Sequence, residues 1–154
     1  MKHFSGIDYE HFLDDIRDMY PFGIEEAMLV ELIANALDAK TSILEFRIDP
    51  ERKTFRLVDN GSGMDARGFE HYHRKGQGIG FAGLGAKLSL RIAERIITET
   101  RSKNIWGASE WHFERKRKTS LPVWFDREER TLAHDGRSVT IELLEKFMSG
   151  WGRI

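Results

Sequence analysis

Apolar residues recur at helical spacing in two neighbouring segments near the start of the chain. In the segment 8–20 (DYEHFLDDIRDMY) they lie on one side of an amphipathic helix. The segment 24–40 (IEEAMLVELIANALDAK) is rich in alanine, leucine and glutamate, which favour helix. Its apolar stripe consists of Leu29, Leu32, Ile33, Ala36 and Leu37. We therefore predict two consecutive helices, separated by the sequence PFG.

Further along the chain, apolar and polar residues alternate, which is typical of β-strands. The runs ILEFRI (43–48) and TFRLVD (54–59) flank the turn sequence DPERK and predict a hairpin. The later elements are expected as a short polar helix at 65–73, a helix at 84–94, and strands at 95–101, 109–115, 121–126 and 138–144. This order predicts a single α/β (α+β) domain over 1–154, a two-layer sandwich with helices on one face of a mixed, mostly antiparallel sheet.

Composition narrows the class of protein without identifying it. At 154 residues the chain is long enough to bury a substantial core. No apolar run approaches the roughly 18–20 residues that cross a bilayer, and the absence of cysteine excludes disulfides and cysteine nucleophiles. We expect an intracellular, cytoplasmic protein without a membrane partner. The net charge of −1 favours no class of partner.

A row of polar side chains interrupts the second helix. Glu31, Asn35 and Asp38 are spaced at i, i+4 and i+7, which places them on one face. They could form only a solvent-exposed stripe. They could also form a magnesium–nucleotide site, because Mg²⁺ prefers oxygen ligands and often takes only one or two from the protein. In that interpretation Asn35 ligates the metal and Glu31 activates water as a general base.

The sequence DNGSGM follows the second strand of the hairpin. Asp59 ends that strand, and an aspartate followed by glycines is also a common turn at a strand end. A buried carboxylate at this point could instead accept a hydrogen bond from the exocyclic amine of adenine. Gly61 and Gly63 would then let the base or sugar approach the backbone, and Met64 would pack against the base.

A glycine-rich stretch at 75–90 (KGQGIGFAGLGAKLSL) leads into a predicted helix. The pattern G-x-G-x-x-G is formed by Gly78, Gly80 and Gly83. An NAD-binding loop with this pattern needs an apolar strand directly before it, which HYHRKGQ does not provide, although Glu99 stands where a ribose-binding acid would. A Walker loop would need the ending G-K-[ST], which is absent. We therefore expect a phosphate cradle of backbone N–H groups and the helix start at Leu84.

Together, these segments resemble the GHKL ATPases, the superfamily of gyrase, a heat-shock chaperone, histidine kinases and MutL. ELIANALDA (31–39), DNGSGM (59–64) and GIGFAGLGAK (78–87) stand in the order of the three motifs of that superfamily, and the resemblance covers about residues 21–101. The glycine-rich motif is most similar to the MORC and heat-shock-chaperone branch. The resemblance implies the Bergerat ATP-binding fold, ATP and Mg²⁺ as ligands, and ATPase activity.

The resemblance also implies roles for individual residues. Glu31 matches the catalytic base, Asn35 the magnesium ligand, and Asp38 an acidic residue that supports the magnesium site. The adenine pocket is matched by Asp59, Gly61, Gly63 and Met64. The segment around the triphosphate is matched by Gly78, Gly80, Gly83, Leu84, Gly85 and the phosphate-binding lysine Lys87. The mobile lid corresponds to about 71–82.

Two features depart from the pattern of the superfamily. Its members often carry a threonine near the start of the last strand, where it supports the adenine-binding aspartate. The nearest residues here are Arg137, Ser138 and Thr140. The chain also ends at Ile154, without a second domain that would supply a further phosphate-binding cation, so we expect slow turnover by this chain alone.

By the same resemblance, ATP would close the lid and promote a homodimer. Two alternatives stay open: a protein phosphotransferase of the histidine-kinase or anti-sigma type, and an ATP-sensing interaction module with little turnover. One basic cluster consists of Arg115, Lys116, Arg117 and Lys118. It could contact nucleic acid, although a charged hairpin turn is the simpler interpretation. His71 and His73 lack a third ligand nearby and predict no metal site.

Overall fold

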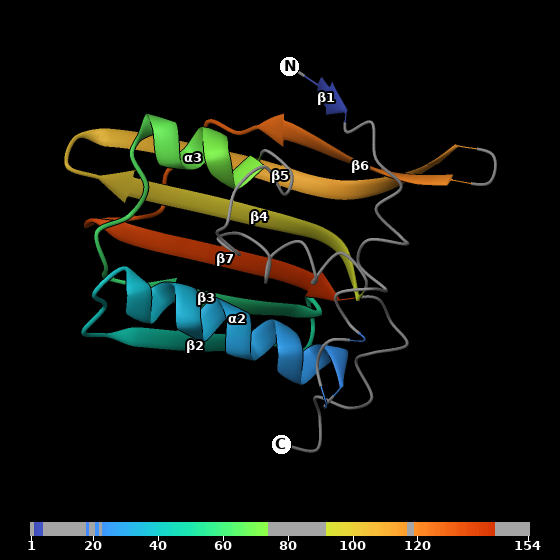
Figure 1. Cartoon of the computed structure of the whole chain (residues 1–154), viewed down its shortest axis with the longest axis horizontal. Helices are drawn as coiled ribbons and strands as arrows, with labels where there is room; N and C mark the ends of the chain where they lie inside the picture. The colour runs from blue at the N-terminus through green and yellow to red at the C-terminus, as the bar shows by residue number, and fades with distance from the viewer. Residues whose placement is uncertain are drawn as a thin grey trace.

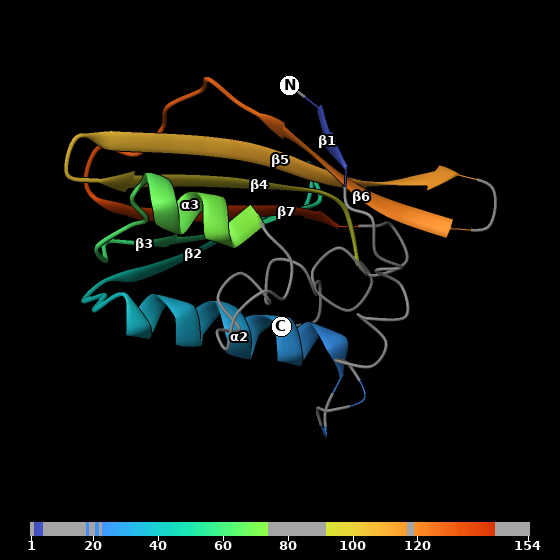
Figure 2. The same ribbon diagram turned by 45° about the horizontal axis from the view of Figure 1, so that its top comes forward.

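The protein is a two-layer sandwich of helices on a sheet. The computed structural model describes residues 2–4, 18, 21, 23–73, 92–116 and 119–143. Within them, seven strands form one sheet, and two helices pack on the same face of it (Figure 1 and Figure 2). This arrangement confirms the predicted sandwich.

The strands lie in the order β1-β6-β5-β4-β7-β3-β2 across the sheet. Their bounds are β1 Lys2–Phe4, β2 Leu44–Asp49, β3 Thr54–Asp59, β4 Ala93–Ser102, β5 Ile105–Lys116, β6 Thr119–Asp126 and β7 Gly136–Leu143. All predicted strands are present. Strand β1 was not predicted, because three residues are too few to show an alternating pattern. Every pairing among the described strands is antiparallel, so this part of the sheet lacks the parallel component that we expected.

The two helices are α2 Ile24–Asp38 and α3 Ala66–His73, both close to their predicted bounds. Helix α2 lies over β3 and its neighbours, and α3 lies over β5 (Figure 1). The helix predicted at 84–94 is wrong at its end, because Ala93 and Glu94 already belong to β4. The start of that helix, and the helix predicted at 8–20 apart from Asp18, lie outside the described residues.

The buried face of α2 differs by one position from the predicted stripe. Its buried residues are Ala27, Met28, Leu32 and Ala36. Leu37, expected in the stripe, is 64% exposed. The sheet contacts the row 28–32–36, and the residue after Ala36 is turned about 100° away from it around the helix axis.

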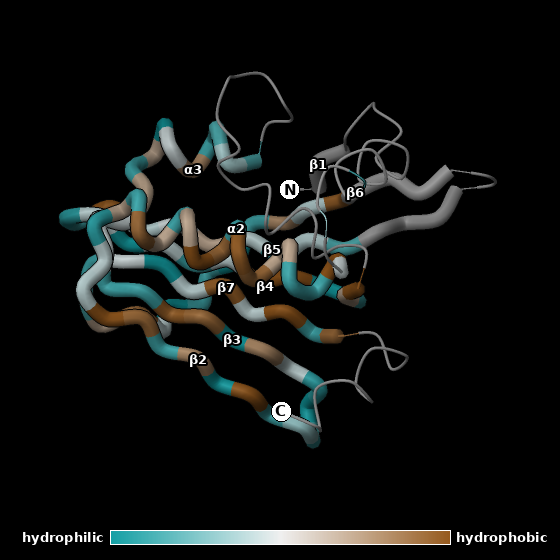
Figure 3. The backbone as a smooth tube through the Cα atoms, turned by 60° about the horizontal axis from the view of Figure 1, so that its bottom comes forward, coloured by the Kyte–Doolittle hydropathy of each residue, from teal (hydrophilic) through white to brown (hydrophobic). Residues whose placement is uncertain are grey.

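The core lies between α2 and the alternate residues of the central strands. Phe55 and Leu57 of β3 are buried, and by register they stand opposite Ile141 and Val139 of β7. Hydrophobic and hydrophilic residues alternate along the strands in Figure 3, as the sequence predicted. Asp59 occupies the next position of the same buried row, so a carboxylate continues the line of core side chains.

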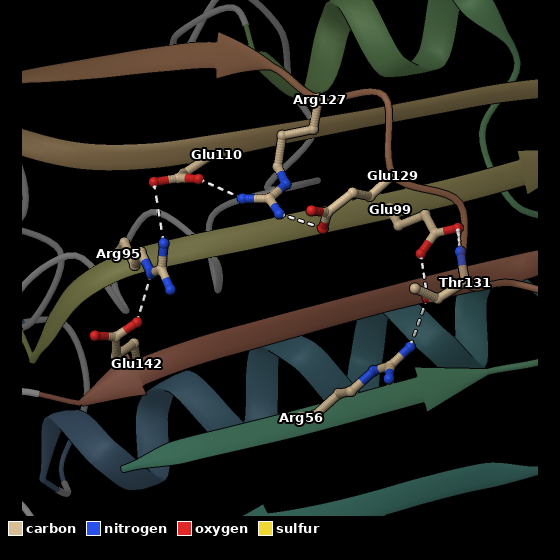
Figure 4. Close-up of polar contacts among 8 residues, drawn as sticks. All are labelled: Arg56, Arg95, Glu99, Glu110, Arg127, Glu129, Thr131 and Glu142. Carbon is tan, nitrogen blue, oxygen red and sulfur yellow. Dashed lines mark hydrogen bonds and ion pairs between the residues drawn. The ribbon is translucent and has the colours of Figure 1, made fainter. Parts of the chain in front are cut away.

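The opposite face of the sheet carries a network of charged side chains (Figure 4). Arg95 pairs with Glu142 and with Glu110, and Glu110 also pairs with Arg127. These contacts join β4, β5 and β7 to the segment that follows β6. The face that is not covered by α2 and α3 is therefore held by polar contacts as well as by the strand ladder.

Candidate functional site

A cavity of about 570 Å³ lies beside α2, α3 and the ends of β3 and β7. Five of the residues predicted for the site line it: Asn35, Asp38, Asp59, Gly63 and Met64. Further lining residues come from α3 and β7: Arg67, Gly68, His71, Tyr72 and Arg137. The structure therefore brings two of the three predicted motifs to one cavity.

Asp59 is the deepest acidic group of this cavity, with an exposed fraction of 1%. Its Oδ1 accepts a hydrogen bond from the backbone N–H of Gly61 at 3.0 Å. Its Oδ2 lies 3.4 Å from Nε of Arg137 and has no hydrogen-bond partner among the described residues. One carboxylate oxygen is thus used to hold the turn, and the other is buried beside the guanidinium of Arg137.

The residues after Asp59 fix the rim of the cavity. The side-chain oxygen of Asn60 accepts hydrogen bonds from the backbone N–H groups of Ser42 and Ile43, so it ties this turn to the connection after α2. The N–H of Met64 donates to Oγ1 of Thr100 on β4 at 2.7 Å. Both contacts make the turn a fixed wall of the cavity.

Gly61 and Gly63 of this turn lie close to neighbouring backbone. A Cβ on Gly61 would lie 2.7 Å from the carbonyl oxygen of Ala39, and Gly61 does not line the cavity. A Cβ on Gly63 would lie 1.9 Å from the carbonyl oxygen of Arg101. A side chain at either position would therefore meet neighbouring protein. Gly63 itself lines the cavity, and the approach of a base or sugar to its backbone stays a prediction.

Helix α3 forms another wall, and it is anchored at both ends. At its start, Oδ1 of Asp65 accepts a hydrogen bond from the N–H of Gly68 at 2.7 Å, as an N-cap does. At its end, the hydroxyls of Tyr72 and Thr98 share a hydrogen bond of 2.6 Å. Burial raises the pKa of the Tyr72 phenol, which keeps it neutral.

His73, the last residue of α3, is buried among aromatic rings. Its ring stacks on Trp124 at 4.1 Å between centroids and lies parallel to Trp111 at 5.3 Å. Because the carbonyl of Phe69 can only accept, Nδ1 donates to it at 2.6 Å, and in the neutral ring Nε2 accepts from the hydroxyl of Ser109 at 2.7 Å. His73 therefore packs among aromatic rings, with both ring nitrogens in hydrogen bonds.

Asn35 and Asp38 bring side-chain oxygens from α2 to the cavity. No group of three or more histidine, cysteine, aspartate or glutamate residues that could hold a metal occurs in the part of the chain that the structure describes. Mg²⁺ does not need such a group, since it often binds one or two protein oxygens together with phosphate oxygens and water. The donor set therefore fits magnesium bound together with phosphates.

Glu31 lies one helical turn before Asn35 on α2 and is half-buried, but it does not line the cavity. The other predicted site residues fall in 74–91, outside the described residues: Gly78, Gly80, Gly83, Leu84, Gly85 and Lys87. Of the predicted lid, only 71–73 is described, as the end of α3. In the basic cluster, Arg115 and Lys116 belong to β5, whereas Arg117 and Lys118 are not described.

The NAD-binding alternative is contradicted by the structure. A helix, α3, stands before the glycine-rich segment where that alternative needs a strand. Glu99, its candidate ribose-binding acid, is buried on β4 and holds the 131–132 backbone instead. Its Oε1 accepts hydrogen bonds from the N–H groups of Thr131 and Leu132 at 2.7 and 2.8 Å, and from Nε1 of Trp106 at 2.9 Å.

Sequence reasoning did not predict the basic and aromatic lining of the cavity. Arg67 and His71 are spaced at i, i+4 on α3, a pattern that could have indicated a shared face. In the sequence, Arg137 stands near the position where a threonine is common. Its place beside Asp59 depends on the pairing of β3 with β7, which the sequence pattern does not specify.

Comparison with known proteins identifies a family. A sequence model of the family described as "Histidine kinase-, DNA gyrase B-, and HSP90-like ATPase" matches residues 23–129. These residues include α2, the turn after β3, and α3. No curated protein matches the chain significantly. None of the described helices is long and apolar enough to cross a membrane.

Proposed function

The chain belongs to the histidine kinase-, DNA gyrase B- and HSP90-like ATPases, and on this premise we propose that its cavity binds ATP with magnesium and that the chain hydrolyses the bound ATP. The observation that carries the proposal is Asp59. Its buried carboxylate has one oxygen without a hydrogen-bond partner among the described residues, and it lines a cavity of about 570 Å³. That volume falls within the range usual for small-molecule sites.

The base of the nucleotide would bind at the Asp59 end of this cavity. An ionised carboxylate only accepts hydrogen bonds, so Oδ2 can take one from the exocyclic amine of adenine. Met64 and Tyr72 also line the cavity and offer apolar surface to the flat base. The fixed turn 59–64 supports this assignment, because a site whose wall does not move loses less entropy on binding.

The phosphates and the metal would lie toward α2. Asn35 would ligate magnesium through its neutral carboxamide oxygen, and Asp38 would hold the water shell of the metal. Bound magnesium would neutralise charge on the phosphate oxygens. The predicted segment 78–87, with Lys87, would enclose the phosphates.

Hydrolysis would use Glu31 as the general base. The carboxylate takes a proton from a water molecule as the water oxygen bonds to the γ-phosphorus. The bond between that phosphorus and the bridging oxygen to the β-phosphate breaks, which gives ADP and inorganic phosphate. The spacing of Glu31 and Asn35, one turn apart on one rigid helix, supports this division of roles.

Binding of ATP would also change the position of the lid and the oligomeric state. The predicted lid, about 71–82, would begin in the last turn of α3, whose residues Tyr72 and His73 are hydrogen-bonded to Thr98 and Ser109 of the sheet. We propose that ATP closes this lid and promotes a homodimer, and that ADP releases both.

Turnover of ATP by Glu31→Gln tests the hydrolase assignment. Gln keeps the shape of the side chain but is no base, so we expect phosphate release to fall by about 10²–10⁴-fold while ATP binding persists. The matched control is Glu26→Gln, an exposed glutamate in the first turn of the same helix, which should leave the rate unchanged.

The same assay with γ-labelled ATP separates the two alternatives. Label transferred to protein would mean a phosphotransferase. Binding without release of phosphate, unchanged in Glu31→Gln, would mean an ATP-sensing module.

A further inference from the structure

Arg137 is the one cation that the structure places deep in the cavity beside Asp59, among the residues it describes. It is the second residue of β7, and the strand register sets it directly opposite Asp59 on β3 and Thr100 on β4. Its exposed fraction is 8%, and its side chain lines the cavity. A fully charged group is therefore buried where the base of a nucleotide would bind.

The hydrogen-bonding groups of this pair are incompletely used. Asp59 Oδ2, Arg137 Nε and Arg137 Nη2 are shielded from solvent, and none has a hydrogen-bond partner in the part of the chain that is described. The distance from Nε to Oδ2 is 3.4 Å, whereas a charge-assisted N–H···O⁻ bond is usually about 2.7–2.9 Å. Arg137 and Asp59 therefore form an ion pair that lacks a hydrogen bond of that length.

Leaving buried donors and acceptors unpaired costs about 1–3 kcal/mol each, and more when the groups are charged. One acceptor and two donors at one end of a cavity therefore form a receptor for a ligand edge that presents a donor beside an acceptor. The edge of adenine that carries the 6-amino group has this pattern, because the amine donates and the adjacent ring nitrogen N1 accepts.

We propose that Arg137 is a base-reading residue. It donates a hydrogen bond to N1 of adenine while Oδ2 of Asp59 accepts one from the 6-amino group. The proposal rests on the proposed function and extends it, because it assigns recognition of the base to two opposed side chains on neighbouring strands instead of to Asp59 alone.

The test compares calorimetric binding of ADP and 1-deaza-ADP, in which a C–H group replaces N1 and the 6-amino group is kept. ADP avoids turnover during the titration. The wild-type chain should bind 1-deaza-ADP about 10–100-fold more weakly, as expected for the loss of a hydrogen bond to a charged group. In Arg137→Met the ratio of the two affinities should fall close to one.

The ratio of the affinities for ADP and 1-deaza-ADP distinguishes recognition of the base by Arg137 from a purely structural role of Arg137. An Arg137 that only supports Asp59 would weaken both nucleotides equally in Arg137→Met and leave the ratio unchanged, which would overturn the proposal. Equal affinities in the wild type would overturn it as well. If Arg137→Met does not fold, Arg137→Lys keeps a positive charge beside Asp59, removes Nη2, and should lower the ratio.

If the cavity is not a nucleotide site at all, the titrations give a different result. In that case the wild type binds neither nucleotide, and the proposal for Arg137 falls with it. Binding of both nucleotides with equal affinity overturns the role of Arg137 but leaves the nucleotide site standing.

Discussion

Three residues of the turn 59–64 have different structural tasks. Asp59 faces the cavity, the side chain of Asn60 holds the connection after α2, and Gly63 passes close to the carbonyl of Arg101. The sequence could predict the aspartate and the turn, because a strand followed by D-N-G-x-G has few other readings. It could not predict Arg137 as the partner of Asp59, because their contact depends on a strand pairing between residues far apart in the chain.

Gly63 should not tolerate a side chain. Its φ is +67°, and a Cβ would lie 1.9 Å from a backbone oxygen that cannot rotate away. We expect Gly63→Ala to lower the free energy of unfolding by about 3 kcal/mol or more, from left-handed strain and the clash together. Urea denaturation measures this loss. Gly68→Ala, within α3, is the control and should change stability by less than about 1 kcal/mol.

Glu99 should make stability depend on pH in the acid range. Burial by itself raises the pKa of this carboxyl, but hydrogen bonds from Thr131, Trp106 and the backbone N–H of Leu132 outweigh it and hold the pKa below the ordinary value. A lowered folded-state pKa means that the stabilisation is complete above the unfolded pKa of about 4.3. It is lost as the pH falls through the folded-state pKa.

The measurement is denaturation of the wild type and Glu99→Gln at several pH values between 7 and 3. At neutral pH the variant should be less stable by about 1–3 kcal/mol, because hydrogen bonds to an ionised acceptor are lost. The difference in the free energy of unfolding between the wild type and Glu99→Gln should become smaller as the pH is lowered. Glu129→Gln, at an exposed ion pair, should cost less than about 1 kcal/mol. A difference between wild type and Glu99→Gln that stays constant with pH would contradict the argument.

At the scale of elements, α2 and α3 are the two supports of the cavity. Helix α2 could be predicted almost to its bounds from composition and periodicity, because it packs one apolar row on the sheet. Its end is less predictable. The N–H of Thr41 bonds to the carbonyl of Ala36 and that of Lys40 to Leu37, which is a Schellman ending with Lys40 at a φ of +58°. A helix that ends in this way usually has glycine at the position that Lys40 occupies here. Because glycine is absent, the sequence pattern does not predict this ending.

Glycine in place of Lys40 should stabilise the protein. A side chain at positive φ is unfavourable, and Lys40 is exposed, so its removal costs little contact. We expect Lys40→Gly to raise the free energy of unfolding by about 0.5–1 kcal/mol, net of the entropy that glycine loses on folding. Lys40→Ala removes the same charge but keeps Cβ, and no gain is expected from it. Equal stability of the two variants would argue against conformational strain.

For the whole molecule, the antiparallel sheet explains how residues distant in sequence form one site. The end of β3 and the start of β7 lie side by side, and α2 and α3 cover the same face of the sheet, so Asp59, Arg137 and Asn35 reach one cavity. The fold class and two of the motifs could be predicted because each follows from local periodicity or turn chemistry. The order of strands could not, since antiparallel strands of similar composition can pair in several ways.

The central claim is that this cavity binds an adenine nucleotide through Asp59. The most direct test is calorimetric titration of Mg-ATP into the wild type and Asp59→Asn, with Asp49→Asn as a control at the end of the neighbouring strand, outside the cavity. The account predicts that Asp59→Asn weakens ATP binding by about 10–100-fold, from loss of a hydrogen bond to a charged acceptor, while the control binds as the wild type does. Equal affinity of the wild type and Asp59→Asn for ATP, or no binding by the wild type, would contradict it.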